Sequence, residues 1–284
     1  MSTLLITKEQ LKKWHACTEG YRWFLDKFPQ GGTYTDVHDA LIADEHYDDA
    51  YWLSNKMYDT YLNNPEFIRA ETASTDKMVG ELTSIEHLSN QTEGKNSSGN
   101  YARIGSSGDR AQIGSSGDYA QIGSSGDYAQ IGNSGDYARI GSSGDYARIG
   151  SSGDYARIGS SGDRAQIGSS GDDARIGSSG DRAQIGSSGD DARIGSSGDR
   201  ARIGSSGYNA RITATGNGSV VACAGSIERI VLGEGGCASV PWHDGTRIRI
   251  AVAYVGENGI EANTPYYVNN EGQFTRLTGT TEEQ

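Results

Sequence analysis

A nine-residue repeat fills the middle of the chain and restricts its fold more than any other feature. From Tyr101 to Ile212 the sequence repeats thirteen times as x-A-(R/Q)-I-G-S-S-G-D, with Ala and Ile at every ninth position. The period of two in x-A-(R/Q)-I predicts a short strand that turns Ala and Ile inward and the other two residues outward. The segment G-S-S-G-D predicts a corner, because glycine adopts positive φ values and Ser or Asp can hydrogen-bond the turn backbone. The repeat therefore predicts a β-solenoid with an Ala and Ile interior.

The outward residues indicate how many repeats make one coil. Residues of one type recur 18 positions apart, and one such column contains Tyr101, Tyr119, Tyr137 and Tyr155. The second outward position separates in the same way into an Arg-rich column, which includes Arg139 and Arg157, and a Gln-rich column. Sorting at 27 positions mixes these classes, although duplication of an 18-residue unit would leave the same pattern. We predict a mainly β protein built on a two-sided β-solenoid (β-helix) of nine-residue half-coils.

The flanking segments predict three further regions. Residues 1–65 form a small α-helical domain, in which a capping box at Thr7 starts one helix that runs to Phe28. Residues 66–98 are a polar connector with a helix around Asp76 to Leu88. The solenoid covers residues 99–212, and residues 213–284 hold degenerate repeats and a C-terminal β cap with a hairpin turn at 269–272. Caps are expected because solenoid ends expose pairing edges. A homodimer formed through the C-terminal cap is a further hypothesis.

Charge and composition restrict the class of partner. The chain has 25 Lys and Arg against 37 Asp and Glu, a net charge of -12. The repeat region itself holds 13 Asp and 12 Arg, so the acidic excess belongs to the two ends. This charge disfavours direct binding to nucleic acid or to an anionic membrane. The sequence contains no signal-peptide pattern or apolar run of membrane-spanning length, and its three cysteines fit a reducing compartment. We expect a soluble protein of the bacterial cytoplasm.

Two sequence features resemble proteins encoded by phages and prophages. One is the helical start A-C-x-x-G-x-x-W-F, found here from Ala16 to Phe24, and the other is a long Gly-Asp-Ala repeat that closes with a tail like the segment 255–268. The resemblance covers all three regions. It implies a short-repeat β-solenoid protein of the host-defence-inhibitor or DNA-mimic type, and it carries over no catalytic residue.

The corner aspartates are the most conspicuous chemical feature, and three interpretations remain open. Eleven of them run from Asp109 to Asp199, and neighbours in the stack would repel one another. They could accept N–H groups of their own turns, bind calcium as in nine-residue β-rolls, or imitate the phosphates of a duplex. The calcium pattern fits poorly, because the acid stands one place early and one glycine is serine. We predict no metal and no cofactor.

Non-enzymatic binding to a host protein complex, for defence or for nucleic-acid handling, is the function that these features favour. No phosphate-binding loop, nucleophile elbow or paired catalytic carboxylate is recognisable, so an enzyme is disfavoured. A structural rod and a small-molecule-sequestering protein are the alternatives. The candidate binding residues on the solenoid are Tyr101, Tyr119, Tyr137, Tyr155, Arg139, Arg157, Asp109, Asp127 and Asp145. Those on the helical domain are Asp36, Asp39, Asp44, Glu45, Asp48 and Asp49.

Overall fold

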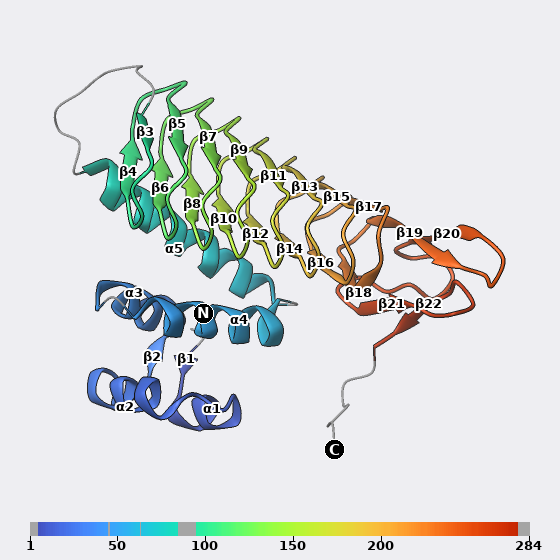
Figure 1. Ribbon diagram of the computed structural model, residues 1–284. Coiled ribbons are helices and arrows are strands. Elements are labelled where there is room, and N and C mark those ends of the chain that lie inside the picture. Colours follow the sequence, from blue (N-terminus) through green and yellow to red (C-terminus); the bar gives the residue numbers. More distant parts are fainter. Residues whose placement is uncertain (1–4, 45, 63, 85–94, 278–284) are drawn as a thin grey trace. The chain divides into compact units, whose positions relative to one another are not determined.

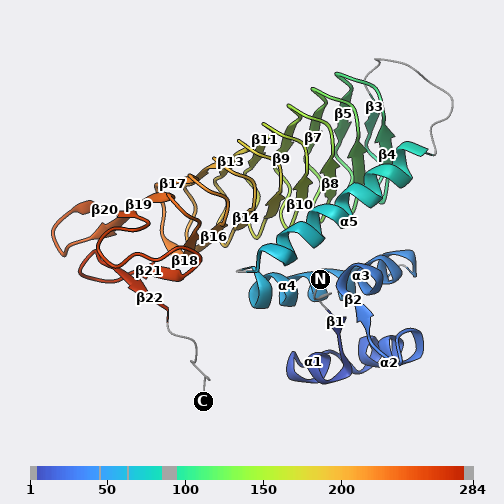
Figure 2. The same ribbon diagram turned by 180° about the vertical axis from the view of Figure 1, so that it is seen from behind.

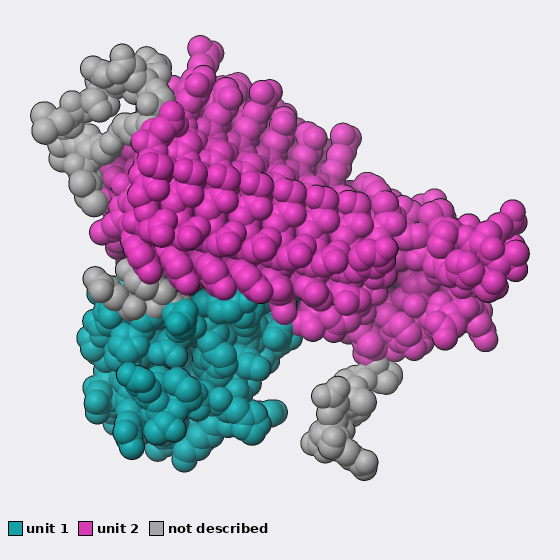
Figure 3. Space-filling view, viewed as in Figure 1, with its two compact units in different colours: residues 1–70 teal, residues 71–284 magenta. Residues whose placement is uncertain are grey.

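The computed structural model describes residues 5–44, 46–62, 64–84 and 95–277. The chain divides into two compact units, residues 1–70 and residues 71–284 (Figure 3). The surface of the second unit shows regular parallel rows of atoms in Figure 3, as expected for stacked coils of nearly identical sequence. Among the described residues, each helix is too short or too polar to cross a membrane.

The first unit is a small helical domain around an aromatic core. Its elements are β1 (Leu5–Ile6), α1 (Lys8–Lys13), α2 (Thr18–Lys27), β2 (Gly32–Thr33), α3 (Tyr34–Ala43), α4 (Tyr47–Tyr61) and the start of α5 (Pro65–Ser84). The capping box predicted at Thr7 is present, with Gln10 as its second member. The single helix predicted from Thr7 to Phe28 is wrong, because His15 has a φ of 57° and separates α1 from α2. Leu11 and Phe24, expected on one helix, still share the buried core with Leu53 and Phe67.

The second unit is a two-sided β-solenoid, which confirms the predicted fold class. Its strands alternate between two sheets of ten strands, drawn as two rows in Figures 1 and 2. The first sheet contains β4 (Arg103–Ser106), β6 (Gln121–Ser124), β8 (Arg139–Ser142), β10 (Arg157–Ser160), β12 (Arg175–Ser178), β14 (Arg193–Ser196), β16 (Ala210–Ala214), β18 (Ile227–Leu232), β21 (Pro265–Val268) and β22 (Phe274–Arg276). The second contains β3 (Lys95–Ser97), β5 (Gln112–Ser115), β7 (Gln130–Asn133), β9 (Arg148–Ser151), β11 (Gln166–Ser169), β13 (Gln184–Ser187), β15 (Arg202–Ser205), β17 (Val220–Cys223), β19 (Cys237–His243) and β20 (Ile248–Tyr254).

Parallel pairing between successive coils holds an 18-residue register. Ile158 of β10 pairs with Ile140 on one side and with Ile176 on the other, and the repeat strands of both sheets follow the same rule. The Ile and Ala columns of both sheets meet in one continuous buried core. Residues 18 apart therefore stack directly, as the sorting of the outward residues predicted.

The position of the strand within the repeat differs from the prediction. Each repeat strand spans (R/Q)-I-G-S, and the variable residue x lies in the corner with a left-handed φ of 54° to 60°. A side chain in that conformation cannot continue an extended strand. The inward set is consequently Ala, Ile and the first Ser of each repeat, and the first Gly points outward between the Arg or Gln and the second Ser. The serine column inside the core was not predicted.

Two antiparallel hairpins close the C-terminal end of the solenoid. The first hairpin, β19–β20, extends the second sheet, and β21–β22 extends the first sheet through β18. The hairpin turn predicted at 269–272 is present, with a φ of 75° at Gly272 and a hydrogen bond of 3.0 Å from its N–H to the carbonyl oxygen of Asn269. Tyr266 lies at the base of this hairpin in the same buried core as the Ile columns.

Candidate protein-binding faces of the solenoid

One carboxylate oxygen of each corner aspartate accepts a hydrogen bond from a backbone N–H. Asp127 donates its N–H to Oδ1 of Asp109 at 3.0 Å, Asp145 to that of Asp127 at 2.9 Å, and Asp163 to that of Asp145 at 2.8 Å. The same bond recurs at all eleven corner aspartates, and Asn100 supplies the equivalent acceptor for Asp118. The prediction that these side chains accept N–H groups is correct, but the donor lies in the next coil and not in their own turn.

This bonding bears on the calcium interpretation. Each carboxylate has one oxygen committed to a backbone N–H, and the exposed Asp109, Asp127 and Asp145 follow one another along a single edge. Among the residues that the structure describes, no group of three His, Cys, Asp or Glu side chains is arranged to hold a metal ion. The ladders are therefore a structural element of the coil that leaves two lines of carboxylate at the surface.

The tyrosine column forms a continuous ring stack beside one of these edges. The rings of Tyr101, Tyr119, Tyr137 and Tyr155 follow one another at centroid distances of 4.9–5.1 Å and are tilted by 6–14°. At the other corner Tyr128 stacks on Tyr146. Successive rings already contact one another at this spacing, which leaves no room for a base between them. The stack can present its edge to a partner, but it cannot intercalate nucleic-acid bases.

Helix α5 covers the outward side of the first sheet, which we call the covered face (β4, β6, β8 and β10). Figures 1 and 2 both show α5 running along this row of strands. Close approach depends on the outward glycines, because a Cβ atom at Gly141 would lie 2.3 Å from Cγ2 of Thr75. A Cβ atom at Gly105 would lie 2.4 Å from the carbonyl oxygen of Leu82. The repeat therefore offers a shallow channel into which a helix fits.

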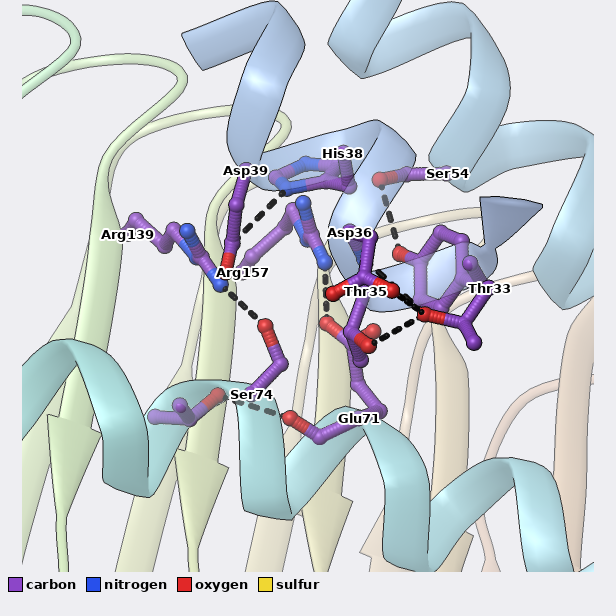
Figure 4. Close-up of polar contacts among 12 residues, drawn as sticks. Thr33, Thr35, Asp36, His38, Asp39, Ser54, Glu71, Ser74, Arg139 and Arg157 are labelled. Atoms are coloured by element: carbon purple, nitrogen blue, oxygen red, sulfur yellow. Dashed lines mark hydrogen bonds and ion pairs between the residues drawn. The ribbon is translucent and has the colours of Figure 1, made fainter. Parts of the chain in front are cut away.

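Two of the predicted binding residues serve to hold this helix. Arg139 donates from Nη2 to Oγ of Ser74 at 2.8 Å, and Arg157 forms a hydrogen-bonded ion pair with Glu71 (Figure 4). Both arginines are less than a tenth exposed. The prediction that Arg139 and Arg157 are surface residues that bind a partner is wrong, because α5 covers both side chains. Most of α5 lies in the segment that was predicted to be a connector.

A half-buried carboxyl also contributes to the docking of α5. Oγ of Ser161 donates a hydrogen bond of 2.8 Å to Oδ1 of Asp76. Burial raises the pKa of the Asp76 carboxyl, and the hydrogen bond from Ser161 only partly opposes that rise. The charged form of Asp76 is therefore a cost to the docked helix, whereas its hydrogen bond is a gain.

The outward side of the second sheet, which we call the open face, has the same repeat, but within the described residues of the second unit no helix packs on it. A groove of about 1000 Å³ runs along it, floored by outward glycines and bordered by Gln130, Arg148 and Gln166. A Cβ atom at Gly132, Gly150 or Gly168 would meet nothing within 4 Å. Sequence reasoning missed this difference between the faces, although the Arg-rich column on the covered face and the Gln-rich column on the open face were its signal.

Several of the predicted acidic residues of the helical domain have partners within that domain. Oγ1 of Thr33 donates a hydrogen bond of 2.7 Å to Oδ2 of Asp36 at the start of α3 (Figure 4). Asp39 lies 4.0 Å from Nδ1 of the buried His38. Asp48 is exposed in the first turn of α4, and Glu45 lies outside the described residues.

Asp44 and Asp49 belong to contacts between helices. Nζ of Lys27 lies 2.8 Å from the Asp44 carboxylate, and Nε1 of Trp23 donates to the same group at 2.8 Å. Both hydrogen bonds lower the pKa of the Asp44 carboxyl, and the one from Lys27 has the larger effect. Oδ1 of Asp49 on α4 accepts at 3.6 Å from Sγ of Cys17, the residue before α2, and Oδ2 lies 3.2 Å from Nδ1 of His46 at the start of α4. Partner binding by this acidic set stays a prediction.

The segment A-C-x-x-G-x-x-W-F has a structural explanation. Cys17 precedes α2, and its Sγ accepts the N–H of Gly20 at 3.2 Å, as expected for a helix N-cap. Gly20 admits the Asp49 side chain, since a Cβ atom there would lie 2.8 Å from Oδ1. Trp23 bonds Asp44, and Phe24 is buried in the core. The motif thus specifies how α2 packs in this domain and indicates no chemistry.

Comparison with known proteins finds one family match, at the N-terminal region, and one similar protein. Residues 1–62 match the family described as the YdhT N-terminal domain. The chain is similar to "Uncharacterized protein YdhT" from Escherichia coli (strain K12), with 38% identity over 76 residues, which is 27% of this chain. The match spans 28% of that protein's length. No solved structure matches the chain. The family match therefore lies within the helical domain, and it does not extend into the solenoid.

Proposed function

We propose that this protein is a non-enzymatic interaction protein that docks an amphipathic helix of a partner protein on the open face of its solenoid. The observation that carries the proposal is the difference between the two faces. One face holds α5 against its outward glycines, whereas the other face, made of the same repeat, is an empty groove. A fold that already binds a helix on one side has the geometry to bind another on the opposite side.

The covered face indicates what such a helix would look like. Thr75, Val79 and Leu82 of α5 face the glycines, at spacings of four and three residues along one side of the helix. Small or branched side chains at this spacing fit a glycine floor, because larger ones would hold the helix away from it. Arg148 and Arg202 border the open groove, so an acidic residue beside the apolar row would complement it as Glu71 complements Arg157.

The resemblance to phage and prophage proteins suggests the class of partner. On that basis the target is a host defence or nucleic-acid-handling complex in the bacterial cytoplasm, and the protein is its inhibitor. The two lines of corner carboxylate support a contribution from local acidic mimicry, since exposed residues such as Asp109, Asp127 and Asp145 repeat at a regular spacing along one edge. A structural rod and a small-molecule-sequestering protein are the alternative proposals.

A labelled peptide of residues 65–84 tests the helix-docking step directly. Fluorescence anisotropy should show saturable binding to the full-length protein and its loss in Gly168→Leu, whose side chain projects into the groove from a position where a Cβ atom meets nothing within 4 Å. Asp181→Asn at a corner outside the groove is the matched control and should bind as the unaltered protein does. Equal binding by Gly168→Leu and the unaltered protein would rule out the open face as the site.

The partner class needs a second experiment with the same variants. Proteins captured from a bacterial lysate by the unaltered protein and by Asp181→Asn, but not by Gly168→Leu, are those that use the groove. A nuclease or surveillance complex among them supports the inhibitor proposal. Capture of virion components alone contradicts it and favours the structural rod.

A further inference from the structure

The terminal strand of the second sheet combines a free edge with an exposed apolar row. Among the described residues, β20 pairs with β19 alone and ends the ten-strand order of that sheet. Its side chains alternate, since Ala251 and Ala253 are buried whereas Ile248, Ile250, Val252 and Tyr254 are 63%, 57%, 52% and 51% exposed. Four large apolar residues in a row on an edge strand are rare in a soluble monomer, because such an edge readily pairs with another chain.

The backbone of the same four residues points toward the free edge. Val255 donates its N–H to the carbonyl oxygen of Gly236 at 2.9 Å, and Asp244 donates to that of Arg247 at 3.1 Å. Antiparallel pairs alternate between bonded and non-bonded positions. In the β19–β20 register the odd-numbered residues from 247 to 255 therefore bond to β19. The even-numbered residues, from Ile248 to Tyr254, direct their N–H and C=O groups away from β19.

We infer that β20 is a dimerisation strand, which pairs antiparallel with β20 of a second copy of this chain. The occupant is a second copy because the strand is complementary to itself. When Ile250 lies opposite Val252 of the partner and Ile248 lies opposite Tyr254 of the partner, all four outward-directed residues of each strand find a backbone partner. A shift of two residues in either direction leaves one of the four outside the paired strand.

Charge is compatible with this register. With the two-fold axis at Ala251, Arg249 lies opposite the partner's Ala253, so the two Arg249 side chains are kept apart. The pairing joins the second sheets of both copies into one continuous sheet, and it places the apolar rows side by side. A closed two-fold contact of this kind consumes both free edges, so it ends at a dimer.

The size of the full-length protein in solution tests the inference. Size-exclusion chromatography with light scattering should give twice the 30.2 kDa mass of one chain at micromolar concentration. Val252→Lys should return the protein to a monomer with unchanged circular dichroism. Val220→Lys is the matched control, since Val220 is 44% exposed on the interior strand β17 of the same sheet and should leave the dimer intact.

A cysteine pair tests the register. The double variant Ile250→Cys and Val252→Cys should form a disulfide-linked dimer under mild oxidation, because the two positions face each other across the axis, whereas either single variant should not. A monomer for the unaltered protein over the whole concentration range, or loss of the dimer in Val220→Lys and Val252→Lys alike, would overturn the inference. A dimer that the double variant fails to cross-link would overturn this pairing of β20.

Discussion

Removing the charge of one corner aspartate separates the two energies that act in the ladder, the repulsion between neighbouring carboxylates and the hydrogen bond to the backbone N–H. Asp145 accepts the N–H of Asp163 and donates its own to Asp127, in the middle of the solenoid. Coils about 4.8 Å apart place neighbouring carboxylates at about that distance. Two unit charges at this separation repel by about 0.9 kcal/mol in water, so two neighbours cost roughly 2 kcal/mol before salt screens them. The hydrogen bond that offsets this cost contributes about 1–3 kcal/mol with a charged acceptor.

Asp145→Asn keeps the acceptor and removes the charge, and Asp145→Ala removes both. The chain itself contains the first geometry, because Asn100 accepts the N–H of Asp118 at 3.0 Å. We expect the Asn variant to match or exceed the unaltered protein by up to about 1 kcal/mol at low salt, with a gain that shrinks at 0.15 M salt. The Ala variant should be less stable than the Asn variant by about 1 kcal/mol, the usual worth of one hydrogen bond.

Urea unfolding followed by circular dichroism, with and without a calcium chelator, measures these differences. A central coil is chosen because solenoids fray from their ends. Equal destabilisation by Asn and Ala would refute the reasoning, since it would mean that the charge and not the acceptor stabilises the corner. Stabilisation by Asn would have a functional implication, because the carboxylates would then be retained at a cost to folding for their surface charge.

Three further predictions concern the docked helix. Glu71→Ala leaves the buried guanidinium of Arg157 without this carboxylate, so the free energy of unfolding from urea titration should fall by about 3–5 kcal/mol, with partial recovery in the double variant that also carries Arg157→Met. The pKa of Asp76 is raised in the folded state, so the charged carboxylate destabilises the fold above that pKa, and this cost disappears as the pH falls. The Asp76→Asn variant should therefore be at least as stable as the unaltered protein at pH 7. Its urea midpoint should also lack this part of the pH dependence. Gly141→Val should displace α5, lower the melting temperature and expose the helix to protease at a cost of about 1–3 kcal/mol, whereas Gly150→Val on the open face should be tolerated.

The fold was predictable because the nine-residue period and the 18-residue recurrence of the outward residues can both be read from the sequence. Residues 18 apart recur in type along the repeat, and the stacking of Tyr119 on Tyr101 and Tyr137 confirms that they lie on one face. The strand position was not predictable, because Tyr, Arg and Asp at position x fit the alternation of a strand, although they take a left-handed φ in the corner. Such a conformation costs energy for these residue types. The N–H of residue x donates to the Asp carbonyl oxygen of the next coil, as from Tyr119 to Asp136 at 2.8 Å, and this bond helps to hold the corner.

The covering of one face was beyond sequence reasoning for a different reason. The buried side of α5 mixes polar residues such as Glu71, Ser74 and Thr75 with the apolar Met78, Val79 and Leu82, so its sequence does not show a continuous apolar face. Its docking depends also on the close approach of the Thr75 side chain to Gly141 and on hydrogen bonds to Arg139 and Arg157. The excess of Arg on one face was visible in the sequence, but it did not indicate that a helix of the same chain would cover that face.

The buried serine column carries hydroxyl groups whose burial costs free energy unless they are hydrogen-bonded. The first Ser of each repeat points inward, and Ser178 is fully buried with no protein hydrogen-bond partner for its Oγ among the described residues. Hydroxyls in adjacent coils, about 4.8 Å apart, are too distant to bond one another directly. An unsatisfied hydroxyl costs about 1–3 kcal/mol, and Ala214 already takes the same place beside Ser196.

Ser178→Ala should therefore raise the free energy of unfolding by about 1 kcal/mol in urea titration, because it removes a buried hydroxyl from a site that accepts a methyl group. Ser179→Ala, one residue later on the outward side, is the control and should change stability by less than about 0.5 kcal/mol. Destabilisation by Ser178→Ala beyond that control would contradict this account. It would mean that ordered water bonds the serine column inside the solenoid, and that the repeat retains serine there to hold it.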